Sequence, residues 1–108
     1  NSDDSSSIHG TLTMAPSESN PYCSQIATAS QRLSKTVVNS ICNQTGSKNR
    51  GVIITDVMSG INWCQVPVTI VEMGFMSNPD EDRLLGDSTY QDKILTGIVL
   101  GINEYFKN

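Results

Sequence analysis

The sequence predicts an α/β fold, a three-layer sandwich in which helices pack on the faces of a mixed or mostly parallel sheet. Short runs rich in β-branched residues alternate along the chain with longer segments whose apolar residues recur at helical spacing. The chain has 108 residues, which is enough for one domain and no more. No internal repeat divides it, so its strands and helices are expected to share one sheet.

The N-terminal segment divides into a polar stretch and a first strand. Residues 1–7 contain only Asn, Ser and Asp, which predicts an exposed loop or arm. Residues 8–14 alternate in polarity, with Leu12 and Met14 on one face, and this pattern predicts a short strand. The domain itself is therefore expected to span residues 8–108.

A long helix is expected after a turn-rich linker. Residues 22–43 predict this helix because their apolar side chains recur at helical spacing. Gly46 follows and is expected to cap its C-terminus, since glycine readily adopts the left-handed conformation that ends many helices. The predicted apolar face consists of Ile26, Leu33, Val37 and Ile41.

Two further strands are predicted in the middle of the chain. Residues 51–56 form an apolar run, and residues 66–72 form another that ends in a carboxylate, Glu72. Residues 57–65, which connect them, are ambiguous and are compatible with a short hairpin or an edge strand.

Two helices are expected in the C-terminal third. Asn78 is predicted to cap a short helix at residues 79–85, with Glu81 completing a capping box. Asp87 or Ser88 is predicted to cap the last helix. The expected apolar stripe of that helix comprises Tyr90, Ile94, Ile98, Ile102 and Tyr105, widened by Leu95, Val99 and Phe106.

Glu72 has the most informative position in the chain. A charged side chain at the end of a core strand is costly to bury unless another group pairs with it or uses it. In open α/β sheets, ligands bind where strands deliver side chains to loops at their carboxyl ends. Glu72 therefore occupies a position typical of catalytic carboxylates.

The stretch from Pro67 to Asn78 also carries a specific motif. Its sequence Pro-Val-Thr-Ile-Val-Glu-Met-Gly-Phe-Met-Ser-Asn resembles the signature of the zinc-dependent N-acetylmuramoyl-L-alanine amidases, which cleave bacterial peptidoglycan. Other segments resemble the same family in the expected order, over roughly residues 8–107: Gly10-Thr-Leu-Thr13, Ser24-Gln-Ile-Ala27, Asn49-Arg-Gly-Val52, Tyr90-Gln-Asp-Lys-Ile94 and Gly101-Ile-Asn-Glu-Tyr-Phe106.

The resemblance implies a zinc site that this chain does not carry in full. The family binds zinc through a His, a Glu and a second His, all N-terminal to the part that matches, and the second His is typically followed by Ala-Asn-Ser. This chain opens with Asn1-Ser2. The resemblance therefore predicts the C-terminal part of a catalytic domain, which lacks its N-terminal strands and most of its zinc ligands.

By this resemblance, Glu72 is the general acid/base. In zinc hydrolases the metal polarises the scissile carbonyl and lowers the pKa of bound water, and a nearby carboxylate passes the water's proton to the leaving amine. The bond implied is the amide between N-acetylmuramic acid and L-alanine. Apart from the motif, Glu72 could be a structural carboxylate paired with Arg50 or with a helix N-terminus. Arg50 could itself bind a substrate carboxylate, because Arg suits planar anions, or form an ion pair beside the sheet.

His9 is the only histidine in the chain. Ser7-Ile8-His9 matches the sequence around the family's second zinc ligand, but the spacing to the segments downstream fits poorly. His9 is therefore a zinc ligand, or else an exposed side chain or one that contacts a partner. One His cannot make a three-ligand catalytic site, so zinc is expected to be held mainly by a missing N-terminal segment.

Charge and hydropathy exclude several partners. The net charge is −4, the pI is about 4.6 and no basic patch is present, which excludes nucleic acid as a partner and gives no attraction to an anionic membrane. No run approaches the roughly 20 apolar residues of a membrane span. The apolar share of 37% is low, which suggests that some buried surface faces a missing piece or a partner.

Three cysteines and a single tryptophan leave alternatives open. The number of cysteines is odd, so at least one is free or pairs outside the chain, and buried free thiols are favoured over a Cys23–Cys42 disulfide. The third cysteine, Cys64, matches no zinc-ribbon spacing with the others.

Trp63 could stack on a sugar or belong to the core or rim of the fold.

Two functions from different classes follow. The first is part of a peptidoglycan hydrolase, extracellular or bound to the bacterial cell wall, which acts on muropeptides only together with its N-terminal segment. The second is a non-catalytic cell-wall binding or interaction module on a degenerate amidase fold. If the domain is truncated, the sheet edge where the missing strands paired is exposed, which predicts dimerisation or strand exchange. A rigid monomer in light scattering at high concentration would contradict that expectation.

Overall fold

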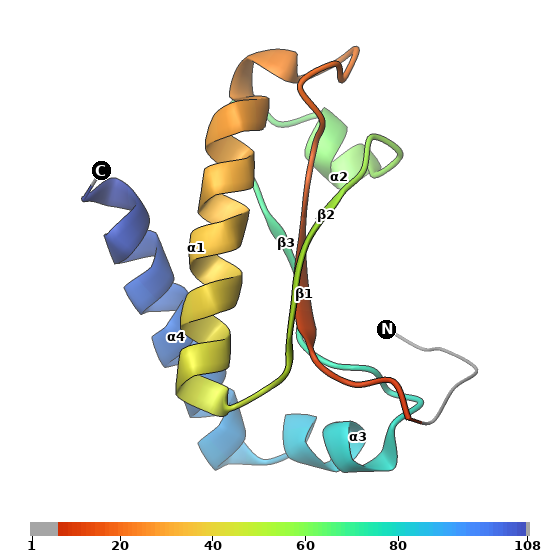
Figure 1. Cartoon of the computed structure of the whole chain (residues 1–108), viewed down its shortest axis with the longest axis vertical. Coiled ribbons are helices and arrows are strands. Elements are labelled where there is room, and N and C mark those ends of the chain that lie inside the picture. The colour runs from red at the N-terminus through yellow and green to blue at the C-terminus, as the bar shows by residue number, and fades with distance from the viewer. Residues whose placement is uncertain (1–6, 108) are drawn as a thin grey trace.

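A three-stranded mixed sheet lies at the centre of the molecule. The computed structural model describes residues 7–107, and residues 1–6 of the predicted arm lie outside them. The strands are β1 (Thr11–Ala15), β2 (Asn49–Ile54) and β3 (Ile70–Glu72), in the order β2-β1-β3. The central strand β1 runs parallel to β2 and antiparallel to β3 (Figure 1). The sheet is therefore mixed, as the sequence predicted.

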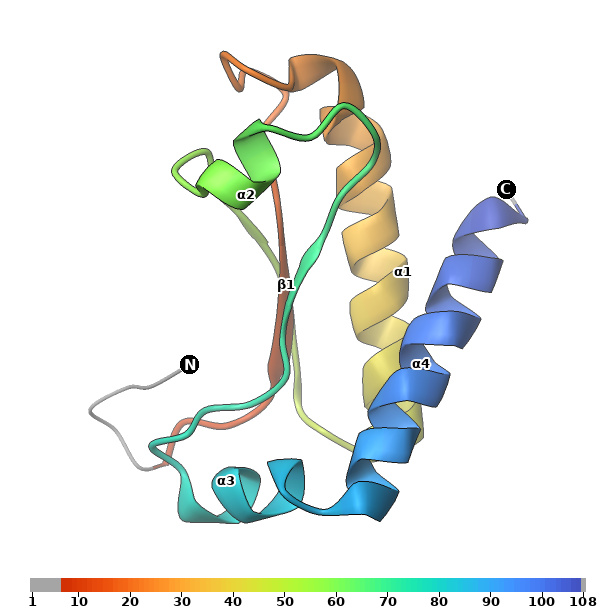
Figure 2. The ribbon, with the colours of Figure 1, turned by 180° about the vertical axis from the view of Figure 1, so that it is seen from behind.

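Helices flank this sheet. They are α1 (Ala27–Thr45), preceded by the 3-10 turn η1 (Ser24–Ile26), then α2 (Ser59–Asn62), α3 (Pro79–Leu85) and α4 (Ser88–Phe106). Figures 1 and 2 show α1 along one face of the sheet, α4 on the outer side of α1, and α2 on the opposite side of the sheet. The short helix α3 crosses the end of the sheet where β1 begins. The predicted α/β class is confirmed.

Several buried polar groups lie between the sheet and α1, alongside its buried aliphatic side chains. The Thr13 hydroxyl donates to the Ser34 carbonyl at 2.9 Å, and the Ser34 hydroxyl lies 2.7 Å from the Thr69 hydroxyl. The Val68 N–H donates to the Ser30 hydroxyl at 2.9 Å. Within residues 7–107, no buried side-chain nitrogen or oxygen lacks a hydrogen-bond partner, so burying these groups carries little desolvation penalty.

The opposite face of the sheet carries a small apolar cluster. Cys23, Ile26 and Ile61 are buried there, and Met14 and Ile70 of the sheet pack against them. The prediction of a hairpin or edge strand at residues 57–65 is wrong, because Ile61 is anchored in this cluster from a single helical turn, α2. The predicted strand at residues 66–72 is also too long, since only Ile70–Glu72 pair with β1.

Two helix ends follow the sequence prediction. Gly46 ends α1 in the left-handed conformation, with φ of 74°. Asp87 caps α4, and its side chain accepts a hydrogen bond from the Thr89 N–H.

The two long helices approach each other through glycines. A Cβ atom at Gly97 would lie 2.6 Å from the Ile41 Cα, and one at Gly101 would lie 2.9 Å from the Val37 Cα. The Ser40 hydroxyl donates to the Gly97 carbonyl at 2.6 Å. Since this face of α4 meets α1, the side chains predicted to widen its buried stripe are instead exposed: Leu95, Val99 and Phe106.

Replacing Gly97 with Ala is expected to destabilise the fold by about 1–3 kcal/mol, because the new methyl group would overlap the backbone of α1 and force the helices apart. Gly60→Ala is the matched control, since nothing lies within 4 Å of its Cβ position. Urea unfolding of both variants measures the difference. Equal midpoints for the two variants would contradict the close helix contact.

A carboxylate and two amides fix the loops at the carboxyl end of β1. Asp56 accepts hydrogen bonds from the Ser17 N–H at 2.8 Å, from the Ser17 hydroxyl and from the Asn20 amide at 2.7 Å. The buried Asn20 amide also donates to Asn62 of α2 at 2.8 Å. The hydrogen bonds from Ser17 and Asn20 lower the pKa of Asp56 below its ordinary value.

This network makes part of the stability dependent on pH. The pKa of Asp56 is lower in the folded than in the unfolded chain, so the ionised carboxylate stabilises the fold. This stabilisation is fully present above the pKa of the unfolded chain, about 3.9, and is lost as the pH falls through the pKa of the folded chain. The Asp56→Asn variant is expected to lack this pH-dependent stabilisation, because it has no carboxylate at position 56. The difference in unfolding free energy between the two proteins should shrink below about pH 4. A difference that is constant from neutral to strongly acidic pH would contradict the prediction.

The three cysteines are free thiols, as favoured from the sequence. Cys23 is buried, and its burial raises the pKa of the thiol, which keeps it neutral. Within the described residues, no helix is both long and apolar enough to cross a membrane.

Candidate functional site

The three residues singled out from the sequence gather at one end of the sheet. Because β3 is antiparallel to β1, its last residue, Glu72, lies opposite Leu12 near the beginning of β1. Because β2 is parallel to β1, its first residues, which include Arg50, lie at the same end. His9 precedes β1 there. The topology therefore places Glu72, Arg50 and His9 at the same end of the sheet, although they are far apart in sequence.

The register of β3 sets the direction of Glu72. Val71 lies opposite Thr13, whose hydroxyl bonds to α1. Successive side chains of a strand point to opposite faces, so Glu72 points to the face of the sheet that α1 does not cover. Its side chain is half-buried. A carboxylate in this position is fixed by the strand yet accessible from one side.

The loop after β3 is held by a second carboxylate, Glu81. Its two oxygens accept hydrogen bonds from the Gly10 N–H at 2.9 and 3.0 Å, and one of them accepts from the Phe75 N–H at 2.9 Å. Glu81 is only 8% exposed. The predicted capping box is therefore wrong for Glu81, because its carboxylate joins the start of β1 to the loop that follows Glu72.

Asn78 acts as the sequence predicted. Its side-chain oxygen accepts from the Asp80 N–H at 3.0 Å and from the Glu81 N–H at 3.2 Å, and Pro79 takes the first helical position. This cap starts α3 at the point that brings the Glu81 side chain back under Gly74, whose added Cβ would lie 3.5 Å from a Glu81 oxygen.

Arg50 is exposed and lies across the end of the sheet. Its Nη1 donates to the His9 carbonyl at 3.4 Å, and its guanidinium carbon lies 5.6 Å from the centre of the Phe75 ring. The contact with Phe75 orients the side chain. The exposed guanidinium can therefore meet a planar anion at the same end of the sheet as Glu72.

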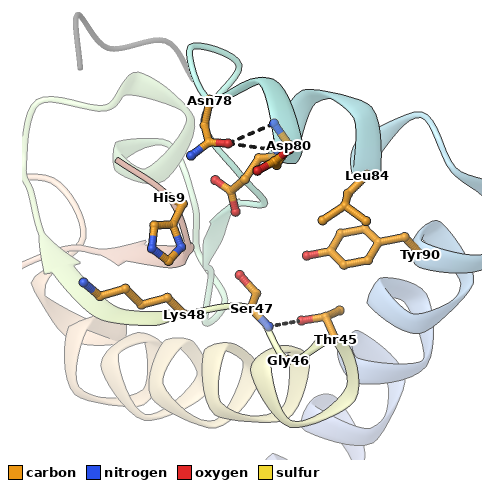
Figure 3. A pocket seen from close by; sticks show the side chains of 10 residues that line it. His9, Thr45, Gly46, Ser47, Lys48, Asn78, Asp80, Leu84 and Tyr90 are labelled. Atoms are coloured by element: carbon orange, nitrogen blue, oxygen red, sulfur yellow. Dashed lines mark hydrogen bonds between the residues drawn. The ribbon is translucent and has the colours of Figure 1, made fainter. Parts of the chain in front are cut away.

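His9 lines a cavity of about 420 Å³ on the side of α1 (Figure 3). Figure 3 shows the side chains of His9, Ser47 and Tyr90 around this space, with Asn78 and Asp80 of the α3 start on its far side. Glu72 and Arg50 are not among the residues that line it. Sequence reasoning missed Ser47 and Tyr90 as residues that line the same cavity as His9, because Ser47 follows the end of α1 and Tyr90 lies in the first turn of α4.

The residues that the structure describes do not complete a zinc site. Among residues 7–107, no group of three or more His, Cys, Asp or Glu side chains could hold a metal ion. His9 is the only imidazole in the chain, and a catalytic zinc needs three protein ligands.

Comparisons with known proteins assign a family to this geometry. The family model described as N-acetylmuramoyl-L-alanine amidase matches residues 1–104. A germination-specific N-acetylmuramoyl-L-alanine amidase of Bacillus subtilis is 50% identical over 40 residues, which are 37% of this chain and 17% of that protein.

Solved structures share the fold. The CwlD amidase of Clostridioides difficile, solved in complex with the GerS lipoprotein, matches with a TM-score of 0.87 and 30% identity, over 99% of this chain and 51% of that one. The catalytic domain of the amidase CwlV from Bacillus (Paenibacillus) polymyxa matches with a TM-score of 0.82 and 27% identity, over 99% of this chain and 54% of that one. This chain thus spans about half the length of these relatives. It belongs to the N-acetylmuramoyl-L-alanine amidase family.

Proposed function

We propose that this chain supplies the catalytic glutamate of a peptidoglycan amidase, which hydrolyses the amide between N-acetylmuramic acid and L-alanine. The observation that carries the proposal is the position of Glu72, half-buried at the end of β3 on the face of the sheet that α1 leaves open. Membership of the amidase family supports the reaction type.

In this proposal Glu72 is the general acid/base. Its carboxylate removes a proton from the attacking water, so that the oxygen can add to the amide carbonyl carbon. The same proton then passes to the amide nitrogen as the carbon–nitrogen bond breaks, because an amide anion is too poor a leaving group to depart unprotonated. The products are a lactyl carboxylate on the sugar and a free L-alanine amino group.

Arg50 is proposed to position the substrate. Its exposed guanidinium, held over Phe75 and beside the His9 carbonyl, suits a carboxylate of the stem peptide. Arg50 is therefore expected to affect KM more than kcat.

Zinc remains part of the proposal, and most of its ligands are expected to come from the N-terminal part of the amidase domain. The described residues lack the necessary cluster, so no step is assigned to the metal through them, and His9 could contribute one ligand at most. The expected partner is the N-terminal part of the domain, and the expected location is the bacterial cell wall or outside the cell. Dimerisation through an exposed sheet edge stays a prediction.

A non-catalytic cell-wall binding module is the second candidate. The observation that favours it is the same lack of a metal-binding cluster among the described residues. Under this alternative Glu72 has a structural role, and supplying the zinc ligands of a relative would not produce activity.

A hybrid protein tests the proposal. The chain is joined to the N-terminal half of the Bacillus subtilis germination-specific amidase, which it resembles, and is incubated with purified peptidoglycan. We expect zinc-dependent release of stem peptides that stops with a chelator and returns with added zinc. The chain alone is the control. A hybrid that folds and binds zinc but releases no peptide would overturn the amidase proposal in favour of the binding module.

A further inference from the structure

Two exposed aromatic side chains line one cavity far from Glu72. Trp63 is 85% exposed and Tyr22 is 69% exposed, and together with Ser59 and Asn62 they line a cavity of about 290 Å³. This cavity lies beside α2 and the turn before α1, at the carboxyl ends of β1 and β2. Glu72 lies at the other end of the sheet. The cavity is therefore separate from the proposed catalytic site.

Hydrogen bonds beneath the cavity hold its walls in place. The Asn20 side-chain oxygen accepts from the Tyr22 N–H at 2.7 Å, and the Asn20 amide donates to the Asn62 side-chain oxygen at 2.8 Å. The Asn62 amide in turn donates to the Asp56 carbonyl at 2.9 Å. One buried residue, Asn20, thus connects the segment that carries Tyr22 to the helix that precedes Trp63. A site preorganised in this way loses little entropy on binding.

The side chains that line the cavity match the chemistry of a sugar. The face of an aromatic ring carries partial negative charge and attracts the C–H groups on the face of a pyranose. The Ser59 hydroxyl has no hydrogen-bond partner within the described residues, and the Asn62 amide keeps one N–H and one oxygen lone pair for a ligand. Two rings with a hydroxyl and an amide at their side can therefore bind both the apolar face and the polar edge of a saccharide.

We propose that Tyr22, Ser59, Asn62 and Trp63 form a saccharide-binding site for the N-acetylated glycan strand of the wall polymer. The choice of this glycan rests on the proposed function, since an amidase that acts on a polymer gains from a second contact with it. Before cleavage the lactyl groups of the glycan strand are held in amide linkage and carry no charge, so the net charge of −4 does not repel the strand itself.

The single tryptophan of the chain makes the site directly observable. Titration with a soluble tetrasaccharide of N-acetylglucosamine is expected to produce a saturable change in Trp63 fluorescence. The Tyr22→Ala variant should raise the apparent Kd about fivefold to tenfold, because one of the two stacking surfaces is lost. Phe106→Ala is the matched control, since Phe106 is 77% exposed on α4 and does not line the cavity. Its Kd should equal that of the unmodified chain.

Two results would overturn the proposal: no fluorescence change at millimolar tetrasaccharide, or a Kd that Tyr22→Ala leaves unchanged. A response to a sugar-free stem peptide alone would assign the cavity to a peptide instead. The Glu72→Gln variant separates this site from the proposed function. It should bind the tetrasaccharide normally even if the hybrid enzyme proves inactive, whereas an active hybrid that binds no tetrasaccharide would refute only the saccharide site.

Discussion

Replacement of Glu72 by Gln is expected to lower kcat of the assembled hybrid enzyme by about 10²–10⁴-fold, the range typical for loss of a general acid/base. Gln has nearly the shape of Glu but cannot accept the proton of the attacking water. Since Glu72 ends β3 and points away from α1, the substitution should leave the fold and the zinc content unchanged. Peptide release measured at saturating peptidoglycan gives kcat, and metal analysis gives the zinc content.

The control for Glu72→Gln is Glu104→Gln, which removes a carboxylate near the end of α4 that pairs with Lys107 at the surface. This control should retain full activity. A loss of less than tenfold for Glu72→Gln would assign the proton transfer to another group. A loss accompanied by reduced zinc content would indicate that Glu72 supports the metal site instead.

Glu81→Ala is expected to cost about 3 kcal/mol or more of unfolding free energy. The carboxylate accepts hydrogen bonds from the Gly10 and Phe75 N–H groups, and each buried N–H left without a partner costs about 1–3 kcal/mol. Glu81→Gln keeps one acceptor oxygen and should have an intermediate stability. Urea unfolding monitored by circular dichroism measures both variants.

Asp82→Asn is the matched control for Glu81, because Asp82 lies next to it on α3 but is exposed. Its stability should change by no more than about 0.5 kcal/mol. If Glu81→Ala lowered the unfolding free energy as little as Asp82→Asn does, the Glu81 carboxylate would not be the group that holds the loop after Glu72 to the start of β1.

Local sequence signals predicted the parts of the fold that local chemistry determines. Gly46 ends α1 and Asn78 begins α3, since each acts on backbone groups within a few residues. The strand that ends in Glu72 was also predictable from its β-branched run, although only Ile70–Glu72 pair with β1.

Contacts between distant residues could not be read from the sequence. Glu81 and Gly10 are 71 positions apart, and a capping-box pattern gives no sign that the carboxylate points elsewhere. The direction of β3 could not be predicted from the sequence either. Sequence reasoning placed Glu72 at the carboxyl end of its own strand, but only the antiparallel pairing shows that this is the end of the sheet where His9 and Arg50 lie.

The buried face of α4 could not be predicted from its apolar pattern either. The apolar pattern of α4 predicted a wide buried stripe, but Gly97 and Gly101 form the contact with α1. A glycine gives no hydrophobic signal, so its role in a close helix contact appears only in the structure.

Mass spectrometry of the products released from peptidoglycan by the hybrid enzyme tests the central claim most directly. The account predicts stem peptides with a free L-alanine amino terminus and glycan strands with intact glycosidic bonds. Cleaved glycan strands, or peptides cut within the stem, would contradict the assignment of the muramoyl–alanine amide as the bond that is hydrolysed with the help of Glu72.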